Sequence, residues 1–339
     1  MRIEQDFDLT AMTTFGVKVK CKRFVEATTT EELQEAIDMI ATDDDPLLVI
    51  GGGSNLLFTR NFPGSVIHPR ITGVRLVDAD TSGNLHVEVG SGEQWDNFVS
   101  LCVEKGWHGA ENLSLIPGEV GASAVQNIGA YGVEVSDIIE KVRALDTCNG
   151  LIADIPMSQC GYSYRHSRFK DEWKGRFIVT HVTFKLSNIF SPKLDYGNIR
   201  AELAKKGITR PTPLQLRETI IDIRRHKLPD PKMEGNAGSF FINPVVSRAK
   251  YESLAEHYPD MPHYKIDYLN EKIPAGWLIE RCGWKGKKVG HAGVHNRQAL
   301  VLVNYGEASG AEILHLSDLI RKDVNEKFGI ELTPEVNII

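Results

Sequence analysis

Residues Leu47 to Phe58 read LLVIGGGSNLLF, a short apolar run followed at once by three glycines, a serine and an asparagine. The apolar run, Leu47 to Ile50, predicts a short buried strand. The glycines at 51–53 allow positive φ angles and let backbone N–H groups approach a ligand closely. A loop of this kind can form a nest of N–H donors for a pyrophosphate. A tight turn after a strand, without a ligand, explains a glycine triplet equally well.

Two common nucleotide-binding motifs are excluded for this loop. A Walker A loop ends in Gly-Lys-Ser/Thr, and no lysine follows these glycines. The dinucleotide fingerprint GxGxxG requires a glycine at the position that Leu56 occupies. The loop is therefore a candidate phosphate site of neither common type.

A second glycine-rich stretch, IPGEVGASAVQNIGAYGVE, spans Ile116 to Glu134. Its small residues leave much backbone and little side-chain bulk, which suits a large planar cofactor lying against the chain. The apolar periodicity is poor, so a plain core helix is the weaker interpretation. Two such loops in one chain favour a dinucleotide cofactor without identifying it. The small residues are Gly118, Gly121, Ala122, Ser123, Gly129 and Ala130.

Capping boxes predict four amphipathic helices, because a side-chain oxygen and a glutamate or glutamine three residues later satisfy free backbone donors. The first helix is expected to reach about Ile40, the second to end at Gly106 and the fourth to end at Gly329. The four boxes are Thr29 with Glu32, Ser91 with Gln94, Thr212 with Gln215, and Ser309 with Glu312.

Short β patterns lie between these helices, at 47–50, 85–90, 178–186 and 299–303. The helices are few, the strands are short and their alternation is irregular, which favours an α+β fold over a doubly wound parallel sheet. The proline-rich segment TRPTPLQ, Thr209 to Gln215, indicates a boundary between a larger N-terminal part and a smaller C-terminal part.

Composition and charge narrow the class of protein. The 339 residues carry a net charge of −6, which argues against a nucleic-acid-binding surface over the whole protein. No run approaches the roughly 18 apolar residues of a membrane-spanning helix, and acidic residues stand where a signal peptide needs an apolar core. We therefore expect a cytoplasmic protein with no nucleic-acid partner and no membrane insertion. The cysteines are scattered and lack a CxxC pair, which suits reduced thiols: Cys21, Cys102, Cys148, Cys160 and Cys282.

Six motifs in this chain resemble, in order and spacing, those of the UDP-N-acetylenolpyruvoylglucosamine reductases, the MurB family. The resemblance covers essentially the whole chain and is specific, because none of the motifs is a generic glycine pattern. The motifs are TTFG (13–16), GGGSNLLF (51–58), IPGEVGASAVQNIGAYGVE (116–134), GYSYRHSRFK (161–170), KLPDPKMEGNAGSFFINP (227–244) and TPEV (333–336).

The resemblance implies a bacterial flavoenzyme with an α+β fold of the vanillyl-alcohol-oxidase kind. Two FAD-binding subdomains would occupy 1–69 and 70–212, and a smaller α+β substrate-binding domain would occupy 213–330. Residues 331–339 would return a catalytic glutamate to the active site. The implied reaction is the NADPH-dependent reduction of UDP-N-acetylglucosamine enolpyruvate to UDP-N-acetylmuramate, a step towards peptidoglycan. The FAD would be bound non-covalently, and the resemblance implies a monomer.

Three residues match the catalytic positions of this family. Arg165, in YRHS, would grip the substrate carboxylate and stabilise the enolate, because its guanidinium is planar and always charged. Ser239, in GNAGSFF, matches the proton donor, and Glu335, in TPEV, matches a third catalytic residue that polarises the intermediate or relays the proton. Each of them, taken singly, is more often a structural residue; their joint occurrence in family context favours the catalytic assignment.

The remaining site residues also follow from the resemblance. Tyr196, in LDYGNI, resembles the mobile-loop tyrosine of the long form of the family. The implied substrate contacts are Tyr131, Tyr164, Tyr196, Lys227, Asn243, Tyr264 and Gln298. The implied FAD contacts are Gly51, Gly52, Gly53, Ser54, Asn55, Leu56, Ile116, Pro117, Gly118, Gly121, Ala122, Ser123, Gln126, Asn127, Gly129, Ala130, Tyr131 and Gly132.

One charged cluster and one histidine pair have plain structural explanations. Lys227 closes a basic run from Arg224, which also suits a helix C-terminus complementing the macrodipole. His291 and His295 stand four apart, a spacing that binds zinc on a helix. Gly290 and Gly293 argue against a helix there, and no third ligand is evident, so no metal is predicted.

Two other functions remain open from the residues alone. The first is an FAD oxidase of the same superfamily, which a histidine tethering the flavin would favour; neither glycine-rich stretch contains one. The second is a non-catalytic module that binds a flavin or a UDP-sugar. The presence of Arg165, Ser239 and Glu335 argues against it.

Overall fold

The computed structural model describes residues 1–41 and 45–339, which form two compact units. Unit 1 contains residues Met1–Phe7, Cys21–Gly53 and Pro63–Arg225, and unit 2 contains Asp8–Lys20, Ser54–Phe62 and His226–Ile339. The chain therefore alternates between the units, and unit 2 is assembled from three separate stretches of sequence. The three-domain division at residues 69 and 212 stays a prediction.

The first sheet of unit 1 has the strand order β1-β2-β5-β3. Strand β3 lies parallel to β5, with Leu47 opposite Ser65 and Val49 opposite Ile67. Helix α1 begins as expected after Thr29, whose hydroxyl accepts a hydrogen bond from the Glu32 N–H at 3.1 Å. The strands are β1 (Arg2–Asp8), β2 (Lys20–Ala27), β3 (Leu47–Val49) and β5 (Phe62–Pro69), and the helix is α1 (Thr30–Ile40).

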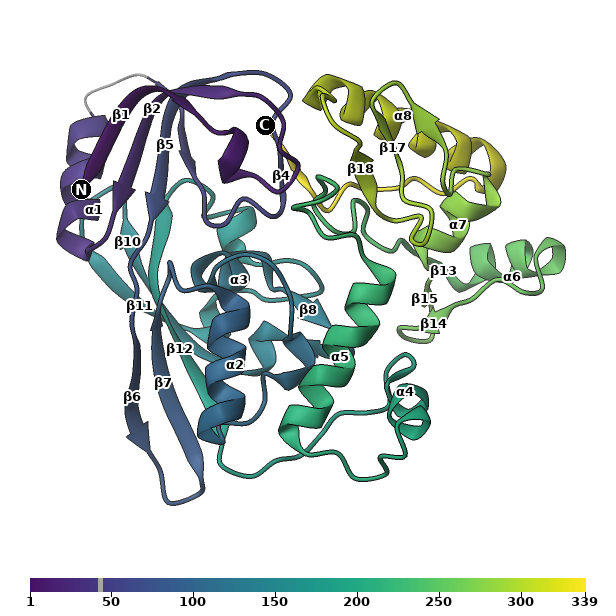
Figure 1. Ribbon diagram of the computed structural model, residues 1–339, viewed down its shortest axis with the longest axis horizontal. Helices are drawn as coiled ribbons and strands as arrows, with labels where there is room; N and C mark the ends of the chain where they lie inside the picture. The colour runs from purple at the N-terminus through teal and green to yellow at the C-terminus, as the bar shows by residue number, and fades with distance from the viewer. Residues whose placement is uncertain (42–44) are drawn as a thin grey trace. The chain divides into compact units, whose positions relative to one another are not determined.

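The second sheet of unit 1 has the order β11-β10-β12-β7-β6, with antiparallel neighbours throughout. Helices α2 and α3 cover one face (Figure 1), and Trp95, Phe98 and Phe184 pack together between helix and sheet. The bounds are β6 (Val74–Ala79), β7 (Asn84–Gly90), β10 (Ile139–Asp146), β11 (Ile152–Pro156), β12 (Phe177–Ser187), α2 (Trp95–Lys105) and α3 (Val120–Gln126).

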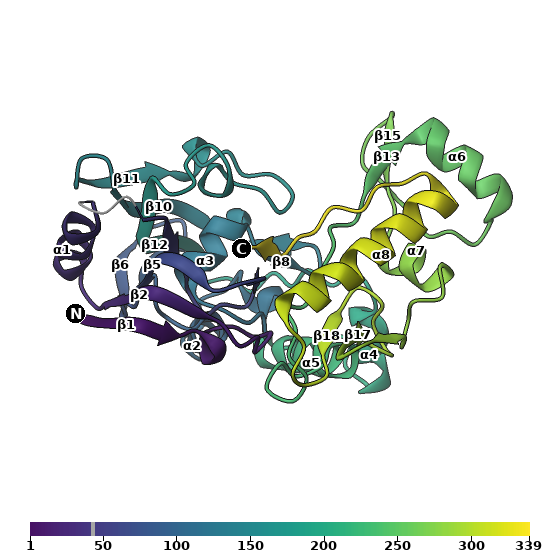
Figure 2. The ribbon, with the colours of Figure 1, turned by 90° about the horizontal axis from the view of Figure 1, so that it is seen from above.

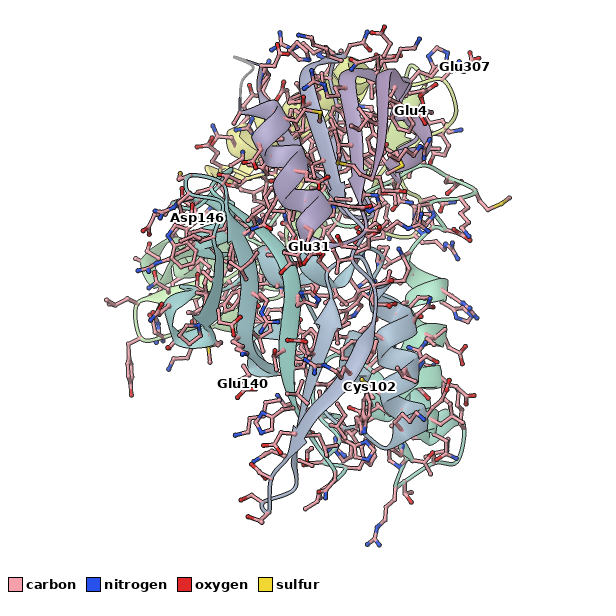
Figure 3. All side chains as sticks on the ribbon, turned by 90° about the vertical axis from the view of Figure 1, so that its left-hand side faces the viewer. Glu4, Glu31, Cys102, Glu140, Asp146 and Glu307 are labelled. Carbon is pink, nitrogen blue, oxygen red and sulfur yellow. The ribbon has the colours of Figure 1, made fainter. Side chains whose placement is uncertain are left out.

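On the other face of this sheet, basic and acidic side chains form a network of ion pairs. Arg143 contacts both Asp154, at 2.7 Å, and Glu88, at 3.0 Å, and Arg75 contacts Glu88 at 2.8 Å. An antiparallel sheet commonly has one packed face and one polar face, and here α1 packs against Leu145 and Ile178 at one end of the sheet. Figure 3 views these strands with Glu140 and Asp146 of β10 labelled.

The remaining elements of unit 1 include two helices. Helix α5 has the expected capping box, because the Thr212 N–H donates to Gln215 Oε1 at 2.9 Å and the Gln215 N–H donates to Thr212 Oγ1 at 3.2 Å. A small core of Leu194, Ile199 and Leu216 links α5 to α4. The bounds are α4 (Ile199–Lys205), α5 (Pro213–Lys227, which continues into unit 2), β8 (Gly129–Ala130) and β9 (Val133–Glu134), with short 3-10 helices at 111–113, 135–137, 157–159 and 168–170.

One helix start was predicted wrongly. Helix α2 begins after Gln94, not after Ser91, and Gln94 makes no side-chain cap. Ser91 follows the last residue of β7, and its hydroxyl donates instead to the Pro69 carbonyl at 3.1 Å. The predicted end is confirmed, because Gly106 takes the left-handed conformation at φ 70°.

Unit 2 contains short sheets and a long C-terminal helix, α8, which Figure 2 shows in yellow. The predicted capping box of α8 and its end at Gly329 are confirmed. The predicted strand at 299–303 is shorter, since β18 covers Leu302–Asn304. The bounds are β4 (Leu56–Leu57), β13 (Val245–Ser247), α6 (Arg248–His257), β14 (Tyr264–Lys265), β15 (Asn270–Lys272), α7 (Ala275–Arg281), β16 (Lys288–Val289), β17 (Ala292–Val294), β18, α8 (Gly310–Phe328) and β19 (Asn337–Ile338), with a 3-10 helix at 10–12.

The first residue of α8 has no room for a side chain, which gives a stability prediction. A Cβ on Gly310 would overlap the backbone carbonyl of Phe58, an atom that cannot move aside as a flexible side chain can. We expect Gly310→Ala to lower the free energy of unfolding by about 2 kcal/mol or more, as overpacking a filled site does. Urea unfolding measures the change, and Ala311→Ser, at the exposed next position, is the matched control. Equal stability of Gly310→Ala and wild type would contradict this packing.

Candidate active site

The two glycine-rich stretches lie against each other in unit 1. A Cβ on Gly52 would be 3.0 Å from the Cα of Gly118, and a Cβ on Gly51 would be 3.3 Å from the Cβ of Ala122. Gly53 takes the left-handed conformation at φ 59°, which strains any residue with a side chain. The backbone conformation therefore favours glycine at 53, and a side chain at 51 or 52 would press on its neighbours. It brings the first residues of both predicted cofactor segments together.

The second half of the first loop belongs to unit 2. Asn55 O accepts hydrogen bonds from the backbone N–H and the side-chain amide of Asn337, each at 3.1 Å. The Asn55 amide donates to the carbonyl of Glu335 at 3.3 Å, and β4 pairs with β19 in parallel. Residues 54–56 are thus tied directly to the segment that holds the predicted catalytic glutamate.

The stretch 116–134 contains a helix that the poor periodicity argued against. Helix α3 packs its N-terminal end on the residues before α2, where the Gly121 N–H donates to the Ser91 carbonyl at 2.8 Å. A Cβ on Gly121 would lie 2.7 Å from the Ser91 Cβ. The small residues here thus permit close packing of a short helix, which apolar periodicity does not reveal. The helix ends at Asn127, which takes φ 45°.

Arg165 lies at the tip of a tight turn and reaches back to the segment after α3. Ser163 and His166 exchange both backbone hydrogen bonds, at 3.1 and 2.9 Å, so Tyr164 and Arg165 are the two central residues. Arg165 takes φ 55°, an uncommon conformation for a residue with a long side chain. Strained backbone of this kind clusters at functional sites.

The Arg165 guanidinium contacts backbone oxygens and a carboxylate. Nη2 donates to Gly129 O at 2.5 Å, Nη1 lies 3.5 Å from Asn127 O, and Nη1 lies 3.6 Å from Glu134 Oε1. The Asn127 amide in turn donates to the Ser163 carbonyl at 2.8 Å. The side chain is 18% exposed, so the cation is held in place at the surface of the second glycine-rich segment.

Two predicted substrate tyrosines of unit 1 lie next to each other in this region. Tyr131 takes φ 49°, and its carbonyl accepts a hydrogen bond from the Asn112 amide at 2.9 Å. A Cβ on Gly132 would lie 3.1 Å from the Cβ of Tyr196, so the Tyr196 side chain lies over this glycine. Asn112 also donates to Lys193 O at 2.9 Å and so joins the two tyrosine segments. Burial raises the pKa of the Tyr131 hydroxyl.

Arg224 lies close to Tyr131 and Leu115, which the sequence interpretation did not predict. It was interpreted as part of a basic helix end, but it is half-buried, and its Nε donates to Leu115 O at 3.2 Å. Burial lowers the pKa of its guanidinium, with Tyr131 and Asp96 acting in the opposite direction. The spacing of the two arginines along α5 could have indicated that Arg224 is partly buried. Arg224 lies seven residues after Arg217, which is itself 8% exposed and paired with Asp96 at 2.6 Å.

In unit 2 the backbone brings Ser239 and Glu335 together. Ser239 forms a bridge with Val301, and the Phe240 N–H donates to Leu300 O at 2.8 Å. The Glu335 N–H donates to Phe240 O at 2.8 Å. The predicted proton donor and the predicted third catalytic residue therefore lie on paired segments, one residue apart in register.

Asn236 and the TTFG motif support the turn that precedes Ser239. Asn236 is 4% exposed; its Nδ2 donates to Glu234 O at 2.7 Å, and its Oδ1 accepts from the Gly238 N–H at 2.9 Å. The Asn236 N–H donates to Thr14 O at 3.0 Å. The N-terminal motif thus belongs to unit 2, where it braces the segment GNAGS.

Asn243 and Gln298 converge on the start of α7. Asn243 Oδ1 accepts a hydrogen bond from the Ala275 N–H at 2.9 Å. A Cβ on Gly276 would lie 3.2 Å from Gln298 Oε1. Tyr264 is 49% exposed on β14, and Lys227 is exposed at the end of α5. Of the predicted substrate residues of unit 2, Lys227 and Tyr264 therefore lie on a helix and a strand, and Asn243 and Gln298 lie in two loops.

The histidine pair lies outside the helices, as the neighbouring glycines indicated, and both residues are in loops. His291 and His295 flank β17, and their side chains contact Glu312 Oε1 at 3.1 Å and Glu234 Oε2 at 3.7 Å. Across residues 1–41 and 45–339, no group of three potential metal ligands is found. Within the same ranges, no helix is both long and apolar enough to cross a membrane.

Comparisons with known proteins agree along the whole chain. Residues 230–339 match the C-terminal domain of UDP-N-acetylenolpyruvoylglucosamine reductase, and residues 21–155 match an FAD binding domain. A UDP-N-acetylenolpyruvoylglucosamine reductase of Bacteroides fragilis (strain NCTC 9343) is 52% identical over 338 residues, which cover 99% of this chain and 100% of that protein. One from Pseudomonas syringae pv. syringae is 44% identical over 338 residues, with coverage of 100% and 99%.

The fold comparison points the same way. The crystal structure of the reductase MurB from Thermus caldophilus matches with a TM-score of 0.68 and 26% sequence identity. The match covers 100% of this chain and 99% of that one. It thus extends over both units and all six motifs.

Proposed function

The chain belongs to the UDP-N-acetylenolpyruvoylglucosamine reductase family, and we propose that it reduces its UDP-sugar substrate with electrons that NADPH delivers through FAD. The observation that supports the family assignment most strongly is the 52% identity over the full length. The enzyme class and the FAD requirement follow from it and from the FAD-binding match. The expected α+β fold, a flavin-binding domain of the vanillyl-alcohol-oxidase kind followed by a separate C-terminal domain, is confirmed.

The residues of the two glycine-rich stretches fit a large dinucleotide. Gly51, Gly52 and Gly118 are packed so closely that a Cβ on the first two would meet neighbouring atoms at 3.0–3.1 Å. Backbone exposed in this way can direct N–H groups at a pyrophosphate. We propose that residues 51–56 bind the FAD pyrophosphate and that residues 116–132 lie along the isoalloxazine.

In the proposed reaction, FAD held by residues 51–56 and 116–132 and reduced by NADPH would supply a hydride for the vinyl carbon of the enolpyruvyl ether. Negative charge then develops on the adjacent carbon and on the carboxylate. Arg165 would bind this carboxylate and stabilise the charge, because a guanidinium forms two parallel hydrogen bonds to it. Its anchoring on Gly129 O leaves the planar group held before substrate arrives.

Ser239 would complete the reaction by donating a proton to the enolate carbon. A serine hydroxyl is a weak acid, but a carbanion-like enolate is a strong enough base to take its proton. Glu335 would polarise the intermediate or relay the proton back to Ser239. The backbone pairing of Glu335 with Phe240 supports these two roles, because it holds Ser239 and Glu335 on paired segments, one residue apart in register.

The substrate contacts complete the proposal. We propose substrate contacts by seven residues, with Tyr196 over the pyrophosphate as the resemblance to the long form of the family implies. They are Tyr131, Tyr164, Tyr196, Lys227, Asn243, Tyr264 and Gln298. The product, UDP-N-acetylmuramate, would serve peptidoglycan synthesis in the bacterial cytoplasm. A monomer is proposed for the solution state, which light scattering of the purified protein tests.

Anaerobic stopped-flow absorbance at the flavin band tests the reaction directly. NADPH should bleach the band, and UDP-N-acetylglucosamine enolpyruvate should restore it in the absence of oxygen. Recovery that occurs only with oxygen would indicate an oxidase instead. A colourless protein that takes up no FAD would refute the assignment as a flavoenzyme.

A further inference from the structure

A buried histidine of unit 1 lies between two carboxylates, and none of the three groups has a role in the proposed reaction. His68, on β5, is 6% exposed, and its Nε2 lies 3.1 Å from each carboxylate oxygen of Glu119. Its Nδ1 lies 3.6 Å from Glu26 Oε2, on β2. Since a carboxylate can only accept, Nε2 must carry the hydrogen that is shared with Glu119.

Glu119 is the member of this group closest to the first glycine-rich loop. It is 5% exposed and precedes α3, and its Oε2 would lie 3.1 Å from a Cβ built on Gly51. The loop is fixed to the histidine's own strand, because the Ile50 N–H donates to Ile67 O at 2.9 Å. The carboxylate therefore lies directly against the residues that we assign to the pyrophosphate.

A buried carboxylate in this position repels the negatively charged pyrophosphate and so opposes its binding. Two like charges repel each other strongly where little water separates them. A buried carboxylate that loses its hydrogen-bond donor keeps its negative charge without solvent to stabilise it. The groups that face Glu119 are His68 from β5 and Gln94, whose Nε2 lies 3.3 Å from Oε1. Behind His68 lie Glu26 and Arg70, 3.6 Å apart. Of these, His68 makes the closest contact and touches both carboxylate oxygens.

We propose that His68 is a positioning residue for the cofactor, because it holds the Glu119 carboxylate and offsets its charge beside the phosphate loop. FAD affinity is then set by the His68–Glu119 pair as well as by the loop itself. This inference rests on the proposed location of the pyrophosphate at 51–56.

The two residues of the pair are expected to have opposite effects on FAD affinity. His68→Leu removes the donor and leaves the carboxylate, so the dissociation constant for FAD should rise by about tenfold or more. Glu119→Gln removes the charge and keeps the side-chain shape, so FAD should bind at least as tightly as to the wild type. The double variant should return to within about threefold of wild type, because the charge that His68 offsets is gone.

Titration of the apoproteins with FAD, followed by flavin fluorescence, measures these constants without turnover. His181→Leu, a histidine of unit 1 on β12 that contacts Thr180, is the matched control and should bind FAD normally. The proposal would be overturned if Glu119→Gln bound FAD more weakly than the wild type. It would also be overturned if the double variant bound FAD more weakly than His68→Leu, because the pair would then only support the fold. This result stays decisive if His68→Leu fails to fold, because Glu119→Gln answers independently. Wild-type protein that binds no FAD would instead refute the proposed function.

Discussion

Ser239→Ala should leave the reduction of FAD by NADPH unchanged and slow its reoxidation by the UDP-sugar by about 10³-fold, within the range for loss of one proton-transfer group. The first half-reaction moves hydride from nicotinamide to flavin and needs no proton from serine. The second half-reaction leaves a carbanion-like centre that must be protonated. Single-turnover absorbance at the flavin band measures the two steps separately.

The structure supplies a suitable control for this substitution. Ser253, on α6, is exposed, so Ser253→Ala should leave both half-reactions at wild-type rates. The alanine at 239 itself should not disturb the fold, because the Ser239 segment is held by backbone hydrogen bonds of its neighbour Phe240. If both half-reactions of Ser239→Ala ran at wild-type rates, another group would have to supply the proton.

Arg165→Met should lower kcat/KM for the UDP-sugar by about 10³-fold, at the upper end of the loss seen when one group that stabilises an oxyanion is removed. The guanidinium would act on a charge that grows during hydride transfer, so kcat should fall as well as kcat/KM. Arg165→Lys should be intermediate, because an ammonium keeps the charge but cannot form the bidentate pair. Steady-state kinetics with varied UDP-sugar measures all three enzymes.

Two observations would separate this role from a structural one. Arg75→Met removes an arginine from the charged face of the second sheet, where it pairs with Glu88, and should leave the kinetics unchanged. FAD reduction by NADPH should also proceed normally in Arg165→Met. A loss of FAD binding equal to the loss of turnover would mean that Arg165 mainly supports the Gly129 segment.

Local signals in the sequence predicted helices α1, α2, α5 and α8, whereas α3, α4, α6 and α7 were not predicted. Three of the four predicted helices begin where expected, because a capping box depends on residues three apart and needs no tertiary information. The α2 start failed because Ser91 has a competing acceptor in Pro69 O, far away in sequence. Helix α3 was missed because its packing relies on Gly121 rather than on an apolar stripe.

Some features of the candidate site could be predicted from the sequence and others could not, because contacts between distant residues leave no local pattern. The close contact between Gly52 and Gly118 agrees with the interpretation that two separate glycine-rich loops serve one dinucleotide cofactor. The bond from Asn55 to Glu335 spans 280 residues, and the strands beside it are two residues long. Pairings that short leave no periodic pattern. The burial of Arg224 was hidden by the charges around it.

The assembly of unit 2 from three distant stretches has a consequence for how the protein is made. Residues 8–20 and 54–62 leave the ribosome early, but their partners at 235–236, 304 and 335–339 are synthesised last. At bacterial rates of synthesis, a gap of 280 residues takes roughly 15 to 55 s to translate. The nascent chain must therefore keep apolar segments such as Leu56 and Leu57 from aggregating during that time. A chain whose translation halts before Glu335 keeps the partners of residues 14 and 15 but lacks the strand that pairs with Leu56 and Leu57.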